Sequence, residues 1–288
     1  MTRRLILPTL LLCALLAPAA AHARPVYGMG DQNPTSYQDK RMHGLKKLKT
    51  ARYAVAWDWY KDPTQNALLS WWMGEVKAAH LNPLISFNRN WHGSSGRKKI
   101  PRLSQYKRGF KLFRQRYPYV RDFTAWNEPN APEQPFYKKP AKAARFFNAL
   151  RSACKKCHIV AGDINDSKNM VPWLRTYKRH VRKAKYWGLH NYKDTSSRNT
   201  RGTTKVFARM VRGQVWLTET GGLINRGGLK GQAKSVKRVF TLTHQIKKIK
   251  RVYFYQWRGV RKSHWDSAFL SPAGKKRPAF FTLKRKLR

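Results

Sequence analysis

In DFTAWNEPN, Asp122 to Asn130, a short apolar run ends at an Asn-Glu pair followed by proline. The chain holds 61 basic residues against 13 acidic ones, and only four of the acids are glutamates. A carboxylate at the end of a buried strand costs free energy unless it is paired, hydrated or used. We therefore expect this strand to end at a cleft, where Glu128 has a use.

Seven further apolar runs have a similar length. Segments with helical periodicity separate the runs, and the first of these segments predicts a helix over residues 36–49. The eight runs are VYGMGD from Val26, ARYAVAWD from Ala51, NPLISFN from Asn82, DFTAWNE from Asp122, HIVAGD from His158, KYWGLHNY from Lys185, QVWLTET from Gln214 and RVYFYQW from Arg251. Strands that alternate with helices predict a parallel sheet, because parallel strands need crossover connections. Eight such units predict an α/β fold, a single (β/α)8 TIM barrel over residues 24–288. No Gly-rich phosphate loop follows the first strand, which argues against a dinucleotide-binding fold.

The first 23 residues have the pattern of a cleaved signal peptide. Arg3 and Arg4 precede a short apolar core, and AHA at residues 21–23 is a small-residue cleavage site. The core is too short for a membrane span, and no later segment is long and apolar enough to form one. We therefore expect a secreted, soluble and monomeric protein with a signal peptide at 1–23.

Two cysteines remain after the signal peptide, Cys154 and Cys157 in the string CKKCH. Cysteines three apart at a helix end can bridge, and an oxidising compartment favours a disulfide. The same string matches a c-type haem attachment site, and zinc is a further alternative. Because His158 opens a strand-like run, we expect the disulfide, and we expect neither a cofactor nor a metal.

The formal net charge of +48 points to polyanions such as acidic polysaccharides, envelope polymers, nucleic acid or anionic lipid. An alternative at least as favoured is that a basic proteome or a polyanionic envelope selects a basic surface without any specific recognition of an anion. No metal-ligand cluster or recognition module supports a nuclease or a specific nucleic-acid partner.

The few acids collect where predicted strands end. In a (β/α)8 barrel the active site lies at the C-terminal ends of the strands. Eight of the 13 acids fall there, namely Asp31, Asp58, Glu128, Asp163, Asp166, Asp194, Glu219 and Asp266. This end of the barrel therefore reads as a carboxylate-lined cleft in a cationic body.

Two glutamates stand at the ends of strands four and seven, which face each other across a ring of eight. Strict alternation groups Glu128 with Thr124 and Trp126, and Glu219 with Val215 and Leu217. A strand-end glutamate alone is more often a salt-bridge partner than a catalyst. Two opposed carboxylates are what glycoside hydrolysis requires, one to protonate the leaving oxygen and one to attack or to activate water.

WNEPN at the end of strand four and WLTETG at the end of strand seven resemble the two signatures of clan A retaining glycoside hydrolases. The similarity is to families five and thirty-nine and to related bacterial polysaccharide-cleaving enzymes, and by strand order it covers essentially the whole mature chain. The resemblance implies Glu128 as acid/base and Glu219 as nucleophile, with carboxyl groups roughly 5–5.5 Å apart. It implies a substrate-binding role for four residues: Asn127, His190 and Tyr192 of HNY, and Trp257 as an aromatic floor. Clan families carry an arginine at the end of strand two, where this chain has WDWY.

Tryptophans near the strand ends could stack on sugar rings. They are Trp59, Trp91, Trp257 and Trp265, of which Trp59 is a further predicted substrate-binding residue. The sequence thus predicts a secreted retaining glycosidase that acts on a polysaccharide or oligosaccharide, which could be anionic. The alternative is a non-catalytic secreted barrel that binds an anionic polymer through its charge.

Overall fold

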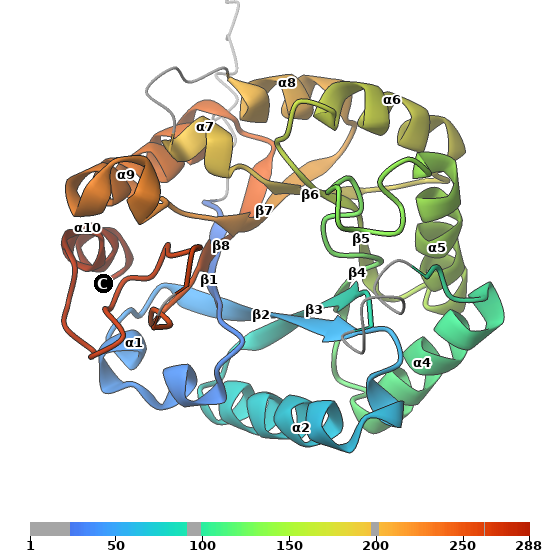
Figure 1. Cartoon of the computed structure of the whole chain (residues 1–288), viewed down its shortest axis with the longest axis horizontal. Helices are drawn as coiled ribbons and strands as arrows, with labels where there is room; N and C mark the ends of the chain where they lie inside the picture. Colours follow the sequence, from blue (N-terminus) through green and yellow to red (C-terminus); the bar gives the residue numbers. More distant parts are fainter. Residues whose placement is uncertain (1–23, 91–98, 197–201, 262) are drawn as a thin grey trace, which may run out of the picture.

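The computed structural model describes residues 24–90, 99–196, 202–261 and 263–288. Eight parallel strands close into one barrel in sequence order, with helices around the outside (Figure 1). The predicted fold is confirmed. The strands are β1 (Val26–Gly30), β2 (Leu48–Ala56), β3 (Asn82–Asn88), β4 (Asp122–Thr124), β5 (His158–Asn165), β6 (Tyr186–His190), β7 (Gln214–Thr220) and β8 (Ile249–Tyr255).

The helices follow the predicted alternation except at the start. They are α1 (Lys40–His43), α2 (Pro63–Ala78), α4 (Leu103–Arg116), α5 (Pro140–Ala153), α6 (Met170–His180), α7 (Tyr192–Ser196), α8 (Thr203–Met210), α9 (Gly228–Gln245) and α10 (Pro278–Leu287), with short 3-10 turns η1 (Pro34–Gln38), η2 (Trp59–Lys61) and η3 (Ile224–Arg226). The single helix predicted over residues 36–49 is wrong. Asp39 ends η1 and its carboxylate accepts from the backbone of Arg41 to start the four-residue α1, after which β2 begins at Leu48.

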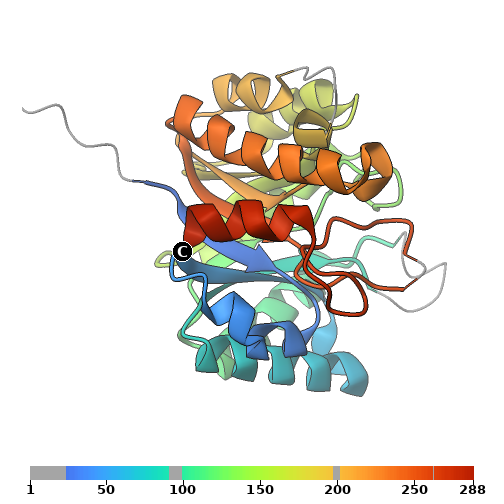
Figure 2. The ribbon, with the colours of Figure 1, turned by 90° about the vertical axis from the view of Figure 1, so that its left-hand side faces the viewer.

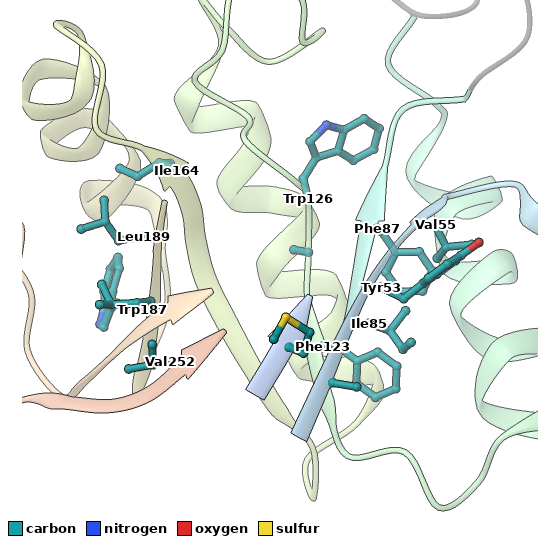
Figure 3. Close-up of a cluster of buried hydrophobic side chains, with 14 of the residues drawn as sticks. Tyr53, Val55, Ile85, Phe87, Phe123, Trp126, Ile164, Trp187, Leu189 and Val252 are labelled. Carbon is teal, nitrogen blue, oxygen red and sulfur yellow. The ribbon is translucent and has the colours of Figure 1, made fainter. Parts of the chain in front are cut away.

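The outward faces of the strands pack against the helices. Figure 3 shows Tyr53, Val55, Ile85 and Phe87 of β2 and β3 close to Phe123 of β4. The rings of Phe87 and Phe123 stack with their centroids 6.4 Å apart. Alternation along each strand therefore sends one face to this outer core and the other face into the barrel.

The barrel interior is filled in layers. Leu84, Val160, Trp216 and Tyr253 form a separate apolar cluster, contributed by β3, β5, β7 and β8. On β5 this layer lies between His158 and Asp163, and on β8 it lies between Arg251 and Tyr255. The apolar layer thus separates the two ends of the barrel.

The two ends differ in their connections. We call the C-terminal ends of the strands with the segments that follow them the mouth, and the segments that lead into the strands the base. Figure 2 shows the long connection from β8 to α10 at the mouth, and the start of β1 near the chain's C-terminus at the base. The predicted disulfide is present at the base, with the Cα atoms of Cys154 and Cys157 5.4 Å apart. Across the described ranges, no helix is long and apolar enough to cross a membrane. The predicted signal peptide lies outside the described residues.

Candidate active site

Five charged side chains meet inside the mouth, and we call them the mouth cluster: Arg52, Glu128, Asp163, His190 and Glu219. They come from β2, from the segment after β4, and from β5, β6 and β7. Arg52, Asp163 and His190 are fully buried, whereas the side chains of Glu128 and Glu219 remain 23% and 15% exposed. The two predicted catalytic glutamates are therefore the members of the cluster that solvent and a ligand can reach.

Glu128 is placed by an irregular segment after a very short strand. β4 ends at Thr124, and Glu128 has a left-handed backbone with φ of 44°. Its backbone N–H donates to the carbonyl of Asp163 at 2.9 Å, which ties this segment to β5. His190 Nδ1 lies 2.8 Å from Glu128 Oε1. One oxygen of the carboxyl group thus contacts His190, and the side chain as a whole remains partly exposed.

Glu219 accepts hydrogen bonds from two side chains, one on strand β2 and one on helix α7. Arg52 Nη1 donates to Glu219 Oε2 at 3.0 Å, and the Tyr192 hydroxyl donates to Oε1 at 3.0 Å. His190 Nδ1 is 3.7 Å from Glu219 Oε2. One imidazole nitrogen therefore lies between the two glutamates.

Strict alternation predicts the wrong faces on β7, and on β4 it fails at Trp126. Val215 and Leu217 belong to the outer core, and Trp216 lies inside the barrel. An extra residue in β7, between Leu217 and Thr220, shifts the pairing with β8 and turns Glu219 inward. On β4 the alternation stops at Thr124, so Trp126 packs outside against Phe136. The glutamates reach the mouth because the strands are irregular there.

Asp163 links the cluster together. It is the extra residue of a second bulge, between Gly162 and Ile164 of β5, and its φ is 57°. Its Oδ2 accepts from Arg52 at 3.2 Å, from Ser86 at 2.7 Å and from Thr124 at 2.9 Å. Its Oδ1 is 3.2 Å from His190 Nε2.

A glycine makes room for this bulge. A Cβ at position 188 would lie 2.9 Å from the Asp163 Cα and 3.0 Å from its Oδ1. Gly188 therefore lets β6 run close enough for His190 to reach Asp163.

The charges of the cluster set its protonation. Burial alone would raise the pKa of Asp163, but the positive charges of Arg52 and His190 lower it far below its usual range. Burial would lower the pKa of His190, but the carboxylates of Glu219 and Asp163 raise it to about 10. Carboxylates likewise outweigh burial at Arg52 and raise its pKa. At neutral pH the imidazole is therefore a cation that donates from both nitrogens.

Tyr192 remains protonated beside the nucleophile candidate. Burial, and then the charge of Glu219, raise its pKa well above the ordinary value. Its hydroxyl therefore donates to Glu219 across the whole physiological range.

Asn127 joins the cluster through arginine. Its Oδ1 accepts from Arg52 Nη2 at 2.6 Å, and its backbone N–H donates to the Phe87 carbonyl. Arg52 was not predicted as a member of the site, and Asp163 was predicted only as one of the acids at the strand ends. Arg52 lies within β2, four residues before Ala56 and before the WDWY stretch in which the clan arginine is missing.

Two of the predicted aromatic contacts are absent from the mouth. Trp59 is buried against α4, where its indole N–H donates to the carbonyl of Gly109 at 3.3 Å. Trp257 is fully buried, and its indole N–H donates to Asp39 Oδ2 at 3.0 Å. Neither ring has a face open to a sugar, so both predicted placements are corrected.

Tyr255 and Trp265 lie closer to the nucleophile candidate. Burial, and then the charge of Glu219, raise the pKa of Tyr255. Trp265 is 41% exposed, and its ring meets that of Tyr192 edge-on at 4.8 Å. Trp91 falls outside the described residues.

Other acids of the mouth support the loops. Asp166 accepts from the backbone of Lys193 and Asp194, and Asp266 pairs with Arg277 at 2.6 Å. Within the ranges that the structure describes, no three His, Cys, Asp or Glu side chains are grouped to hold a metal ion.

Comparisons with known proteins agree with this architecture. The chain superposes on a family 39 glycoside hydrolase from the gut symbiont Bacteroides cellulosilyticus WH2 with a TM-score of 0.66 and 14% identity, covering 92% of this chain and 64% of that one. A family 5, subfamily 18 glycoside hydrolase from Bifidobacterium longum subsp. infantis matches with a TM-score of 0.68 and 12% identity, covering 92% and 79%. The chain has the fold of these glycoside hydrolases.

A third structure has nearly the same extent as this chain. Xylanase 10B from Thermotoga petrophila RKU-1, solved in complex with xylobiose, matches with a TM-score of 0.64 and 14% identity, covering 92% of this chain and 95% of that one. No family model matches the sequence, and no curated protein matches it. The glycoside hydrolase likeness is therefore one of fold, and the chain spans less than two thirds of the Bacteroides enzyme.

Proposed function

We propose that the protein is a secreted retaining glycoside hydrolase that cleaves O-glycosidic bonds of a polysaccharide with Glu128 and Glu219. The observation that carries this proposal is the position of His190 Nδ1, 2.8 Å from Glu128 Oε1 and 3.7 Å from Glu219 Oε2. Since these distances sum to 6.5 Å, the two oxygens lie no further apart than that. This limit allows the separation of roughly 5–5.5 Å between carboxyl groups that double displacement requires.

Glu219 has the environment of a nucleophile. Arg52 and Tyr192 donate to its two oxygens and hold the carboxyl group in place. In the first step a Glu219 oxygen bonds to the anomeric carbon while the bond from that carbon to the leaving oxygen breaks.

Glu128 supplies the proton for the leaving oxygen. When Glu128 carries a proton, the charges of the mouth cluster balance, since Arg52 and His190 offset Asp163 and Glu219. His190 donates to one oxygen of Glu128, which leaves the protonated oxygen for the substrate. In the second step Glu128 takes a proton from water, whose oxygen bonds to the anomeric carbon as Glu219 leaves.

Asp163 is a positioning residue in this scheme. Its side chain makes no hydrogen bond to either glutamate side chain. It binds Arg52 and His190, which in turn contact the glutamates. Its buried negative charge keeps both cations in place, and this fixes the donors around the reacting carboxyl groups.

The test combines a substrate panel with paired variants. We expect new reducing ends from at least one polymer in a panel of xylan, mannan, β-glucan and uronic-acid polymers. Glu219→Ala should abolish turnover on every substrate. Glu128→Ala should lose about 10²–10⁴-fold on natural polymer, and azide should restore turnover on substrates with an acidic leaving group. Glu133→Ala, a change at an exposed glutamate, is the matched control and should keep full activity.

The alternative function has a distinct outcome. A non-catalytic barrel would bind an anionic polymer and release no reducing ends, with Glu219→Ala binding as the natural chain does. Product of inverted anomeric configuration, or full activity in either glutamate variant, would contradict the proposed mechanism.

A further inference from the structure

We propose that the base of the barrel carries a second carbohydrate site, a basic pocket that binds an acidic polysaccharide far from the mouth. The pocket has a volume of about 510 Å³ and lies between the turns that lead into β5 and β6. Five of its ten lining residues are lysine or arginine and none is acidic: Arg151, Lys155, Lys156, Lys183 and Lys185. A repeating polyanion is the ligand that such a lining favours.

The two turns are held in a fixed relation. The disulfide between Cys154 and Cys157 closes the turn that carries Lys155 and Lys156. Arg151 Nε donates to the Lys183 carbonyl at 3.1 Å and so joins this turn to the next.

Asn148 adds two more bonds between α5 and the turn after α6. Its side chain donates to the carbonyl of His180 and accepts from the backbone of Arg182, each at 2.9 Å. The lysines of the pocket therefore project from a preorganised frame, which lowers the entropy cost of binding.

Aromatic side chains make the pocket suitable for a sugar. Tyr186 is half-buried in its wall, with its ring 4.9 Å from that of His158 and 5.2 Å from that of Trp216. The half-buried Tyr186 gives the pocket an aromatic ring for a sugar ring to contact, while the lysines pair with the carboxylate of the sugar. This combination favours an acidic polysaccharide over a polyanion without rings.

The rest of the base extends the positive field. The segments that lead into the strands are residues 24–25, 44–47, 79–81, 117–121, 154–157, 181–185, 211–213 and 246–248. They contain twelve lysines and arginines and no acidic residue. A long chain seated in the pocket therefore meets further positive charge wherever it crosses the base.

This site is separate from the mouth. The apolar layer of Leu84, Val160, Trp216 and Tyr253 fills the barrel between them. Binding at the base therefore leaves the mouth accessible, and the inference stands whether or not the mouth is catalytic.

The decisive experiment compares two sets of four charges. The pocket variant is Lys155→Gln, Lys156→Gln, Lys183→Gln and Lys185→Gln; the control variant makes the same change at Lys107, Lys111, Lys230 and Lys234 on α4 and α9. All eight side chains are exposed, so both variants lose the same net charge without touching the core. Affinity for polygalacturonate is measured at physiological salt in a Glu219→Ala background, which removes any hydrolysis.

We expect the pocket variant to bind about tenfold or more weakly and the control variant less than about threefold more weakly. Equal losses in the two variants would show that only total charge matters and would overturn the site. Equal affinity of the natural chain for polyglutamate would overturn the carbohydrate assignment.

A second measurement uses the unaltered chain and does not depend on the folding of a variant. Lysine acetylation, read by mass spectrometry with and without polygalacturonate, should show protection at Lys155, Lys156, Lys183 and Lys185. The four control lysines should react as before. Protection spread evenly over all eight would contradict a local site.

Discussion

The two ends of the barrel contain the same three residue types in different settings. At the mouth, Asp163 binds Arg52 and His190; inside the opposite end of the barrel, next to the base, Asp122 of β4 binds Arg251 and His158. In both trios an aspartate accepts from an arginine and a histidine of other strands.

The surroundings separate the trios. The side chains of Arg52 and His190 are 3% and 0% exposed. Arg52 also binds Glu219, and His190 also binds Glu128. At the base, His158 is 41% exposed and Arg251 stacks on Trp216 at 4.0 Å. An Asp-Arg-His trio therefore becomes a candidate for catalysis only where its cations hold further carboxylates that solvent can reach.

The largest effect is expected from Asp163→Asn. The change leaves the buried cations Arg52 and His190 without their shared carboxylate, so unfolding free energy should fall by about 3–5 kcal/mol. Turnover should fall by about 10²–10³-fold, because both donors lose their positions. Thermal unfolding and kcat, measured below the transition, check the two parts. A stability loss with unchanged kcat would show that Asp163 is structural only.

The matched change at the base is Asp122→Asn. Since its partners are partly solvated, we expect a smaller loss of about 1–3 kcal/mol in unfolding free energy. Turnover on soluble substrate should stay within about twofold of the natural chain, because the apolar layer separates Asp122 from the mouth. A large fall in kcat would contradict the conclusion that only the trio of Asp163 supports catalysis.

The pH dependence of stability should also differ between the two histidines. The pKa of His190 is raised from 6.5 to about 10 in the folded chain. Its contribution is therefore complete below pH 6.5 and is lost as pH rises toward about 10. In urea unfolding across this window, His190→Gln should remove this fall in stability, whereas His158→Gln should keep it. Identical curves for the two variants would contradict the assignment of the charge to His190.

The smallest effect is expected from removing the disulfide at the base. The bond between Cys154 and Cys157 closes a very short loop, so replacing both residues by serine should cost only about 1–2 kcal/mol. Turnover should not change, while polygalacturonate affinity should fall, since Lys155 and Lys156 lose their fixed turn. Thermal unfolding and the binding assay measure the two outcomes; a change in turnover with unchanged binding would contradict the role given to this turn.

Much of the fold followed from the sequence because eight apolar runs alternate with helical segments. The two glutamates could be located because acids are rare and collect at strand ends. Their orientation could not, since the bulge in β7 and the short β4 interrupt the alternation on which the prediction depended. Arg52 was missed because one buried arginine cannot be told from 61 basic residues by composition. Trp59 and Trp257 were misplaced because closeness in sequence to a strand end does not fix which side of the chain a ring faces.

The contact between Gly188 and Asp163 has a consequence for how such a sequence can diverge. Any side chain at position 188 would meet the bulge that places Asp163, so neither position can drift alone. Substitutions there should be inherited together: lineages that keep the aspartate should keep the glycine, and a lineage that replaced the glycine should show a regular strand five and a different counter-ion for its arginine.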